Sequence, residues 1–263
     1  MKLLVTRLLV SAMASLLVAC STPQISNREF VRSDPASTAL VLASQKTHGA
    51  TAYRKVRKLT VQYNGKWAAV GPRFQPILAD TKFRVGSVEV LNLPDRTIVQ
   101  KHTGVSGKKS VRRSPSRVDV SYNGVATTNQ EIKRAAALVA DAYTMFLLGP
   151  FFFERPGVVL VSAGEAVVDK SVCDQVLAIL KPGFGFAKED RVILSIDRAT
   201  KQLRRVRMTL NGLESTVGAE VDITFREFRM IGGILWPTDF DERIRVPFDL
   251  HAHHWRLTDL KIE

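Results

Sequence analysis

Three kinds of side chain in this sequence could support chemistry: a histidine cluster, two cysteines and several acid pairs. The histidines lie near the end of the chain, at His251, His253 and His254. On a regular strand, His251 and His253 would point to the same side, as a two-ligand metal site requires. No third ligand is identifiable in the sequence. We therefore expect a partly exposed strand edge here, and no metal.

The search for catalytic motifs gives a negative result. The chain has no G-x-S-x-G elbow, no H-E-x-x-H pair and no phosphate-binding P-loop. The acid pairs Glu189-Asp190 and Asp239 with Asp241 lie in turn-like segments and are interpreted as loop residues. We expect no enzyme activity and no cofactor. A hydrolase with an unrecognised set of residues stays as the third-ranked interpretation.

The first cysteine ends a short signal-like segment. Leu17-Val18-Ala19-Cys20 follows an apolar run from Leu8 that is too short to span a bilayer, and Lys2 and Arg7 precede it. This segment resembles the signal of bacterial lipoproteins, in which the lipobox cysteine is diacylglycerylated on sulfur, freed by cleavage and acylated on its amine. The resemblance implies a signal peptide at 1–19 and a lipidated, palmitate-bearing Cys20. The alternative is an ordinary secretory signal.

Lipidation would fix the location of the protein. Three acyl chains hold a protein at a membrane stably, so the folded body would lie outside the cytoplasm. By the same resemblance, Ser21 in place of Asp favours the outer membrane, facing the periplasm, in a host with two membranes. ATP, NAD and chromosomal DNA are absent there, which excludes nucleic acid as a partner. The cell envelope is the expected location.

The chain is strongly basic, with a formal net charge of +13. Such a body is attracted to anionic lipid head groups, lipopolysaccharide phosphates or acidic cell-wall polymer. The densest stretch has glycine and serine between its cations and no acid, which predicts a flexible basic loop. Its residues are Lys101, Lys108, Lys109, Arg112, Arg113 and Arg117, of which the last five are the candidate anion-binding surface. The alternative is a solvated face.

Three further stretches, two near the start and one after the middle, have clear patterns. Residues 20–32 are polar and predict a flexible spacer after the lipidated cysteine. Asp34 or Ser33 can cap a helix that has Pro35 in its first turn and stops at Gly49. Cys173 lies in an apolar run, so we expect a buried small hydrophobe.

Most of the remaining chain predicts antiparallel strands. Apolar and polar residues alternate in about 9–11 short runs, as expected for a sheet with one apolar and one wet face. Asn64-Gly65, Asn123-Gly124 and Asn211-Gly212 are turn signals. The fold class is therefore α+β, with residues 33–263 forming one domain.

The clearest helix lies in mid-chain, with Thr128 and Glu131 at the spacing of a capping box. An apolar stripe follows, Gly149-Pro150 ends the helix, and a phenylalanine triplet comes next. The functional interpretation is that these side chains line or gate a hydrophobic pocket; the alternative is that they pack between lid and sheet. The candidates are Tyr143, Phe146, Leu147, Phe151, Phe152 and Phe153.

The organisation resembles the LolA/LolB-like group of lipoprotein carriers and receptors, which includes mycobacterial lipoproteins of the LppX type. The shared features are the lipobox leader, an opening helix ending at His48-Gly49, an apolar helix block over Asn129 to Val161, and closing hairpins with the loop Asp197-Arg198-Ala199-Thr200. The resemblance covers 33–263. It implies a strongly curved antiparallel half-barrel whose concave face is plugged by helices and holds acyl chains.

The leading hypothesis is a membrane-anchored periplasmic lipoprotein that binds a lipid or a lipid-modified molecule in a half-barrel cavity, with a role in envelope lipid or lipoprotein handling. The alternative is a structural or assembly lipoprotein that contacts cell wall or an envelope complex and has no ligand cavity. A void between sheet and helices favours the first hypothesis, and a solid core favours the second.

Overall fold

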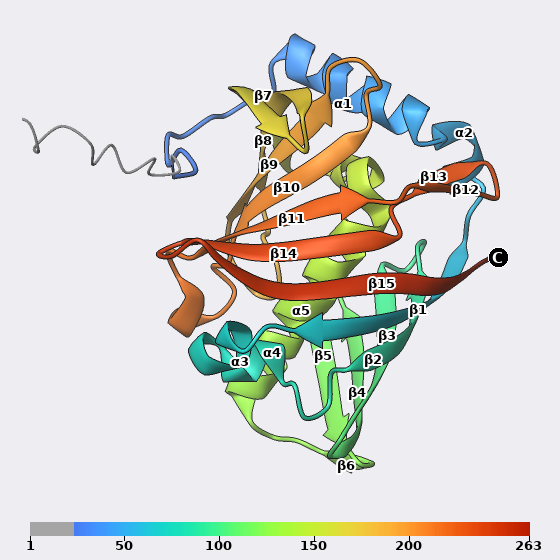
Figure 1. Cartoon of the computed structure of the whole chain (residues 1–263), viewed down its shortest axis with the longest axis vertical. Coiled ribbons are helices and arrows are strands. Elements are labelled where there is room, and N and C mark those ends of the chain that lie inside the picture. Colours follow the sequence, from blue (N-terminus) through green and yellow to red (C-terminus); the bar gives the residue numbers. More distant parts are fainter. Residues whose placement is uncertain (1–23) are drawn as a thin grey trace, which may run out of the picture.

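The computed structural model describes residues 24–263. The predicted signal peptide, Cys20 and Ser21 lie outside the described residues. Thirteen antiparallel strands form one sheet in the order β6-β5-β4-β3-β2-β1-β15-β14-β11-β10-β9-β8-β7 (Figure 1). Because the edge strands β6 and β7 do not pair with each other, the sheet is an open half-barrel, which confirms the predicted fold class. The described part of the chain has more strands than the 9–11 expected.

The first half of the chain forms one side of the sheet and the second half the other. The strands of the first half are β1 (Lys58–Trp67), β2 (Gly86–Asn92), β3 (Thr97–Gly104), β4 (Gly107–Ser114), β5 (Arg117–Tyr122) and β6 (Val125–Ala126). Those of the second half are β7 (Val158–Val168), β8 (Ser171–Leu180), β9 (Asp190–Asp197), β10 (Leu203–Thr209), β11 (Glu220–Arg226), β14 (Asp239–Val246) and β15 (Leu250–Ile262). The last strand, β15, pairs with the first, β1.

The helices are few and mostly short. They are α1 (Pro35–Thr47), α2 (Ala50–Tyr53), α3 (Val70–Phe74), α4 (Pro76–Ala79), α5 (Gln130–Leu148) and the 3-10 turns η1 (Gly149–Phe153) and η2 (Glu214–Thr216). A separate hairpin consists of β12 (Arg229–Ile231) and β13 (Ile234–Trp236). Helix α5 crosses the sheet behind β11, β14 and β15 in Figure 1, and its buried residues form one core cluster with theirs.

Helix α5 fills the concave face with an apolar surface. Its stripe packs against strand residues such as Met208, Phe240 and Trp255, which are at most 2% exposed. The predicted capping box is wrong by one residue, because Asn129 is the N-cap and its side chain accepts from the amide of Ile132 at 3.1 Å. The stretch Gln130–Phe153 is also long and apolar enough to cross a membrane, but most of it is buried inside the protein. The predicted helix block ends before Val158, where β7 begins.

One of the three Asn-Gly signals does not mark a turn. Asn64 and Gly65 lie inside β1 and pair with Arg256 and Trp255 of β15. A Cβ at Gly65 would lie 2.6 Å from Nε2 of His253, so glycine here permits a close approach between neighbouring strands. Asn123-Gly124 does form the predicted turn, between β5 and β6, with both residues at positive φ.

The predicted flexible basic loop is also wrong. Residues 101–117 fall on β3, β4 and β5, which pair in continuous register. Charged side chains alternate between the two faces of β4, so that Lys108 and Arg112 are exposed whereas Lys109 and Arg113 are buried. A hydrophobic pattern alone does not reveal this strand, because its inward positions carry cations.

The start of the described chain lies against the outer face of the sheet. Ile25 is 4% exposed and packs with Val161, Leu177 and Ile179. Its amide donates to Oε1 of Glu220 at 2.7 Å. The guanidinium of Arg191 donates to the main-chain carbonyls of Ser26 and Arg28, which follow Ile25. This part of the predicted spacer is therefore packed on the sheet.

Asp34 joins α1 to the edge strand β7. Its carboxylate accepts from the amide of Ser37 at 2.6 Å and from the amide of Ser162 at 2.9 Å, and these amides hold its pKa below the usual range. We expect Asp34→Ala to lower the free energy of unfolding by about 1–2 kcal/mol, because it removes an N-cap. Asp34→Asn keeps the cap acceptor and should retain most of the stability. Urea denaturation of both variants measures the difference, and equal stability of wild type and alanine variant would contradict the prediction.

Candidate functional site

Helix α5 leaves two cavities on the concave face, one on each side of it. The first, which we call the groove, consists of an outer chamber of about 390 Å³ and an inner one of about 80 Å³. Both chambers are lined by Gln75, Leu210, Val221 and Ile244. The second, which we call the η1 cleft, has about 410 Å³ and is lined by Asp141, Thr144 and Leu148 of α5 and by residues of η1. Cavities of this size hold small ligands.

The groove opens at an apolar mouth. Phe74 of α3, Val217 after η2 and Phe248 between β14 and β15 line the outer chamber. Their exposed fractions are 53%, 66% and 54%, and the rings of Phe74 and Phe248 have centroids 6.0 Å apart. Large apolar side chains that gather around an opening are typical of a binding surface.

The inner chamber ends at a buried guanidinium. Arg84 lies over the rings of Trp67 and Tyr143, at 5.2 Å from each centroid, and its Nη1 donates to the carbonyl of Leu78. No described carboxylate forms an ion pair with Arg84 within 4.0 Å. Stacking on two aromatic faces partly offsets the cost of burying this cation.

Glu242 also lines the inner chamber, on β14. Burial raises the pKa of its carboxyl to about 7, although the charge of Arg84 opposes this shift. His253 of β15 pairs with Glu242 of β14. Burial holds the pKa of its imidazole well below the usual range. The ring of His253 stacks between Trp67 and Trp255, at 3.9 and 4.8 Å. The inner end of the groove is therefore rigid and aromatic.

The η1 cleft is more polar than the groove. Arg113 forms a bidentate pair with Asp141 and donates to the carbonyl of Gly185 at 2.6 Å. Arg155 lies over the ring of Phe152 at 4.3 Å. The cleft therefore differs from the groove in the charged side chains along its walls.

The six predicted lid residues are divided between these cavities and the core. Tyr143 and Phe146 line the groove, and Phe151 and Phe152 line the η1 cleft. Leu147 and Phe153 line neither cavity. All six are at most 9% exposed, so the packing interpretation holds for most of their surface. The sequence did not indicate the mouth residues, because they come from three distant segments.

The five predicted anion-binding residues do not form one surface. Lys109 is 4% exposed and its Nζ pairs with Asp80 at 2.7 Å, while Arg113 is buried against Asp141. Lys108, Arg112 and Arg117 are exposed. The expectation of a shared surface is wrong for the two buried residues, because strand β4 turns them toward α5.

The histidine cluster is split between the two faces of β15. His251 and His254 pair with Asp241 and Asp239 on the outer face, at 2.9 and 2.8 Å, whereas His253 is inside. The register of β14 and β15 shifts between Glu242 and Arg243, and this bulge places His251 and His253 on opposite sides. The prediction that both point the same way is wrong. Among residues 24–263 no group of three or more His, Cys, Asp or Glu could hold a metal ion.

Three residues of the two acid pairs lie on strands, whereas Glu189 lies in the loop before β9, as predicted. Asp190 begins β9, is fully buried and accepts from the amides of Phe184 and Asn211, and burial raises its pKa to about 6. Asp239 and Asp241 lie on β14. Cys173 is buried and free, as predicted.

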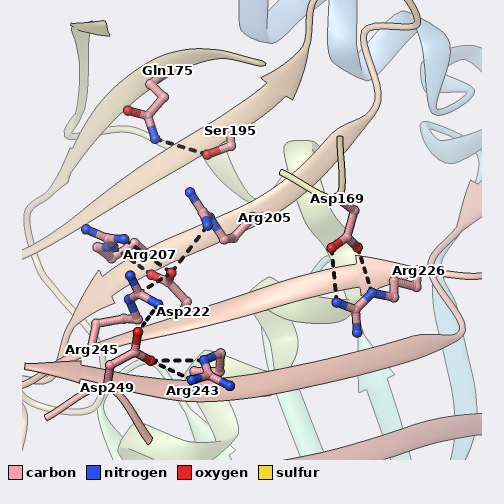
Figure 2. Close-up of polar contacts among 10 residues, drawn as sticks. All are labelled: Asp169, Gln175, Ser195, Arg205, Arg207, Asp222, Arg226, Arg243, Arg245 and Asp249. Carbon is pink, nitrogen blue, oxygen red and sulfur yellow. Dashed lines mark hydrogen bonds and ion pairs between the residues drawn. The ribbon is translucent and has the colours of Figure 1, made fainter. Parts of the chain in front are cut away.

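The outer face of β10, β11 and β14 carries an arginine cluster around two carboxylates (Figure 2). Oδ1 of Asp222 accepts from Arg207 at 2.6 Å, and its Oδ2 lies 3.6 Å from Arg205 and 3.5 Å from Arg245. Asp249 pairs with Arg243 and Arg245 at 2.8 and 2.7 Å. Four guanidinium groups thus surround two carboxylates. The sequence signal for this cluster is the spacing of its arginines, which lie two residues apart at 205 and 207 and at 243 and 245.

Comparisons with solved structures settle the fold. A LolA superfamily protein from Nitrosomonas europaea aligns with a TM-score of 0.53 and 8% identity, over 86% of this chain and 93% of its own. A DUF1329 family protein from Desulfovibrio piger aligns with a TM-score of 0.50 and 10% identity, over the same shares. This chain has the LolA-like fold. In this example of the LolA-like fold, α5 is the plug of the half-barrel.

Sequence comparisons add no closer relative. No protein-family model matches the chain, and no curated protein matches it. The LolA-like fold therefore rests on the structure, and the function is inferred from the residues of the site.

Proposed function

We propose that this chain is a lipid-anchored protein of the cell envelope, at the outer membrane facing the periplasm. Its groove holds the acyl part of a lipid or of a lipid-modified molecule. The observation that carries the proposal is an apolar groove that runs from an exposed aromatic mouth to the rings of Tyr143 and Phe146 under α5. The LolA-like fold supplies the half-barrel in which this groove lies.

The proposed mechanism is burial without a chemical step. Each methylene that leaves water for the groove contributes about 0.8 kcal/mol. Leu210, Val221 and Ile244 supply the apolar walls, and the short helices α3 and α4 border the opening. An acyl chain that enters the groove tail first would reach the aromatic end at Tyr143. Its polar head group would stay at the mouth.

A groove-filling substitution tests this function. Ile244→Trp puts an indole into both chambers, so we expect at least a tenfold loss of affinity for a fluorescent fatty-acyl probe. The matched control is Val88→Trp, at a 40% exposed position of β2 that lines neither chamber. Native mass spectrometry of the protein from its own envelope fraction should show a lipid mass that organic extraction removes.

The rival function is that of a structural or assembly lipoprotein, and the buried positions of all six lid residues favour it. That function predicts no acyl uptake by the wild type and a clean mass without lipid. Equal probe binding by Ile244→Trp and wild type would place any lipid outside the groove.

A further inference from the structure

We propose that the mouth of the groove docks onto an anionic lipid bilayer, with Phe74, Val217 and Phe248 entering the membrane surface and nearby arginines binding lipid phosphates. This inference rests on the proposed function, because it takes Cys20 as the lipid anchor. It adds the orientation of the protein on the membrane and the lipid class that it recognises.

The first argument is the position of the tether. The amide of Ile25 binds Glu220, which begins β11 only three residues after Val217. Four residues lie between Cys20 and Ile25, so the five residue steps of an extended chain reach at most about 17 Å from Ile25. An anchored Cys20 therefore holds the membrane near the mouth of the groove.

The second argument is the shape of this end of the molecule. Residue 246 of β14 pairs with Glu220, and the hairpin that carries Phe248 follows directly. The β14–β15 hairpin, α3 and the first described residues lie along the same side of the molecule, the left side in Figure 1. Three side chains that are each more than half exposed point out of three separate segments there. Removing water from such side chains lowers the free energy only when an apolar phase covers them.

The third argument is charge. Arg73 next to Phe74 is exposed, and the side chain of Arg243 is 38% exposed. Arg243 belongs to the arginine cluster, which has four cations for the carboxylates of Asp222 and Asp249, and the cluster stays positive when Glu220 is counted as ionised. Apolar side chains rimmed by arginine match a bilayer that exposes phosphates.

Docking in this way would let a lipid tail pass from the bilayer into the groove without crossing water. The mouth residues would replace the water that otherwise surrounds a departing acyl chain. The head group would remain beside Arg73 and Arg243, in its usual plane.

The experiment uses the full-length lipidated chain in vesicles of phosphatidylcholine with or without phosphatidylglycerol. Because Cys20 carries lipid and Cys173 is buried, a new cysteine can be labelled with an environment-sensitive dye. Val217→Cys places the dye at the mouth. The control Met230→Cys places it on β12, at a 63% exposed position that lies near the far end of β11. Spin-labelled lipids then quench only a dye that lies in the bilayer.

We expect quenching at 217 and not at 230, in vesicles with phosphatidylglycerol. Arg73→Gln with Arg243→Gln should lower the docked-to-undocked ratio about fivefold for each arginine. The control pair Lys101→Gln with Lys261→Gln removes the same charge from exposed positions elsewhere and should change it little. The proposal would be overturned by equal quenching at both positions, by no quenching at 217, or by an equal loss in both charge pairs. The mouth would then be a candidate site for a protein partner.

Two further measurements separate this proposal from the proposed function. Flotation with vesicles reports the anchor, and uptake of the fluorescent acyl probe reports the groove. Flotation and uptake without quenching at 217 would overturn only the docking. A chain that does not float would overturn the anchor, and the docking with it.

Discussion

Trp255→Ala is expected to lower the free energy of unfolding by about 3–5 kcal/mol, a large part of the stability of an ordinary domain. The indole is 2% exposed and lies where α5 meets the sheet. It stacks on Phe240 at 5.1 Å with an interplanar angle of 1°, and on Tyr143 at 5.1 Å. Its removal would leave a cavity between packed aromatic rings that cannot collapse into it.

Chemical denaturation followed by circular dichroism measures this effect. Val88→Ala on the outer face is the control, and we expect its free energy of unfolding to change by less than about 0.5 kcal/mol. A loss below 1 kcal/mol in Trp255→Ala would show that the helix and the sheet do not depend on this contact.

Glu242→Gln is expected to stabilise the protein at pH 8 and to have little effect at pH 5. Burial raises the folded-state pKa of Glu242 to about 7, above its unfolded value of 4.5. Stability from the neutral carboxyl is therefore fully present below about pH 4.5 and is lost as the pH rises through 7. The loss for wild type between pH 5 and pH 8 amounts to about 2 kcal/mol.

The measurement is the difference in unfolding free energy between variant and wild type across that pH range, which removes the contributions of other titrating groups. Asp241→Asn, next in sequence on the outer face of β14, is the control; no stability gain like that of Glu242→Gln is expected at pH 8. A difference that does not change with pH would mean that Glu242 titrates near its ordinary value in the folded protein.

The sequence predicted most of the architecture because hydrophobic alternation follows burial directly. Runs such as Val192, Leu194 and Ile196 alternate cleanly, and all three side chains are fully buried. Strand β4 escaped this pattern, because Lys109 and Arg113 occupy inward positions where their charges are neutralised by Asp80 and Asp141. A buried ion pair depends on a partner from elsewhere in the chain, which periodicity does not register.

The site was less predictable than the fold. The aromatic residues near Tyr143 were identified because they are consecutive or helically spaced, and four of the six line a cavity. The mouth combines residues 74, 217 and 248, which only the sheet order brings together. The single bulge near residue 252 reversed the expected faces of His251 and His253, and a one-residue irregularity leaves no signal in alternation.

The place of β15 in the sheet has a consequence for the order in which the chain can fold. This strand lies between β1 and β14 and joins the two halves of the half-barrel. Until its thirteen residues are available, β1 and β14 each keep an open edge that can pair with other chains. A chain that is made from its N-terminus therefore completes the sheet only once β15 has been made, and a truncation that removes β15 would leave two open edges in the middle of the sheet.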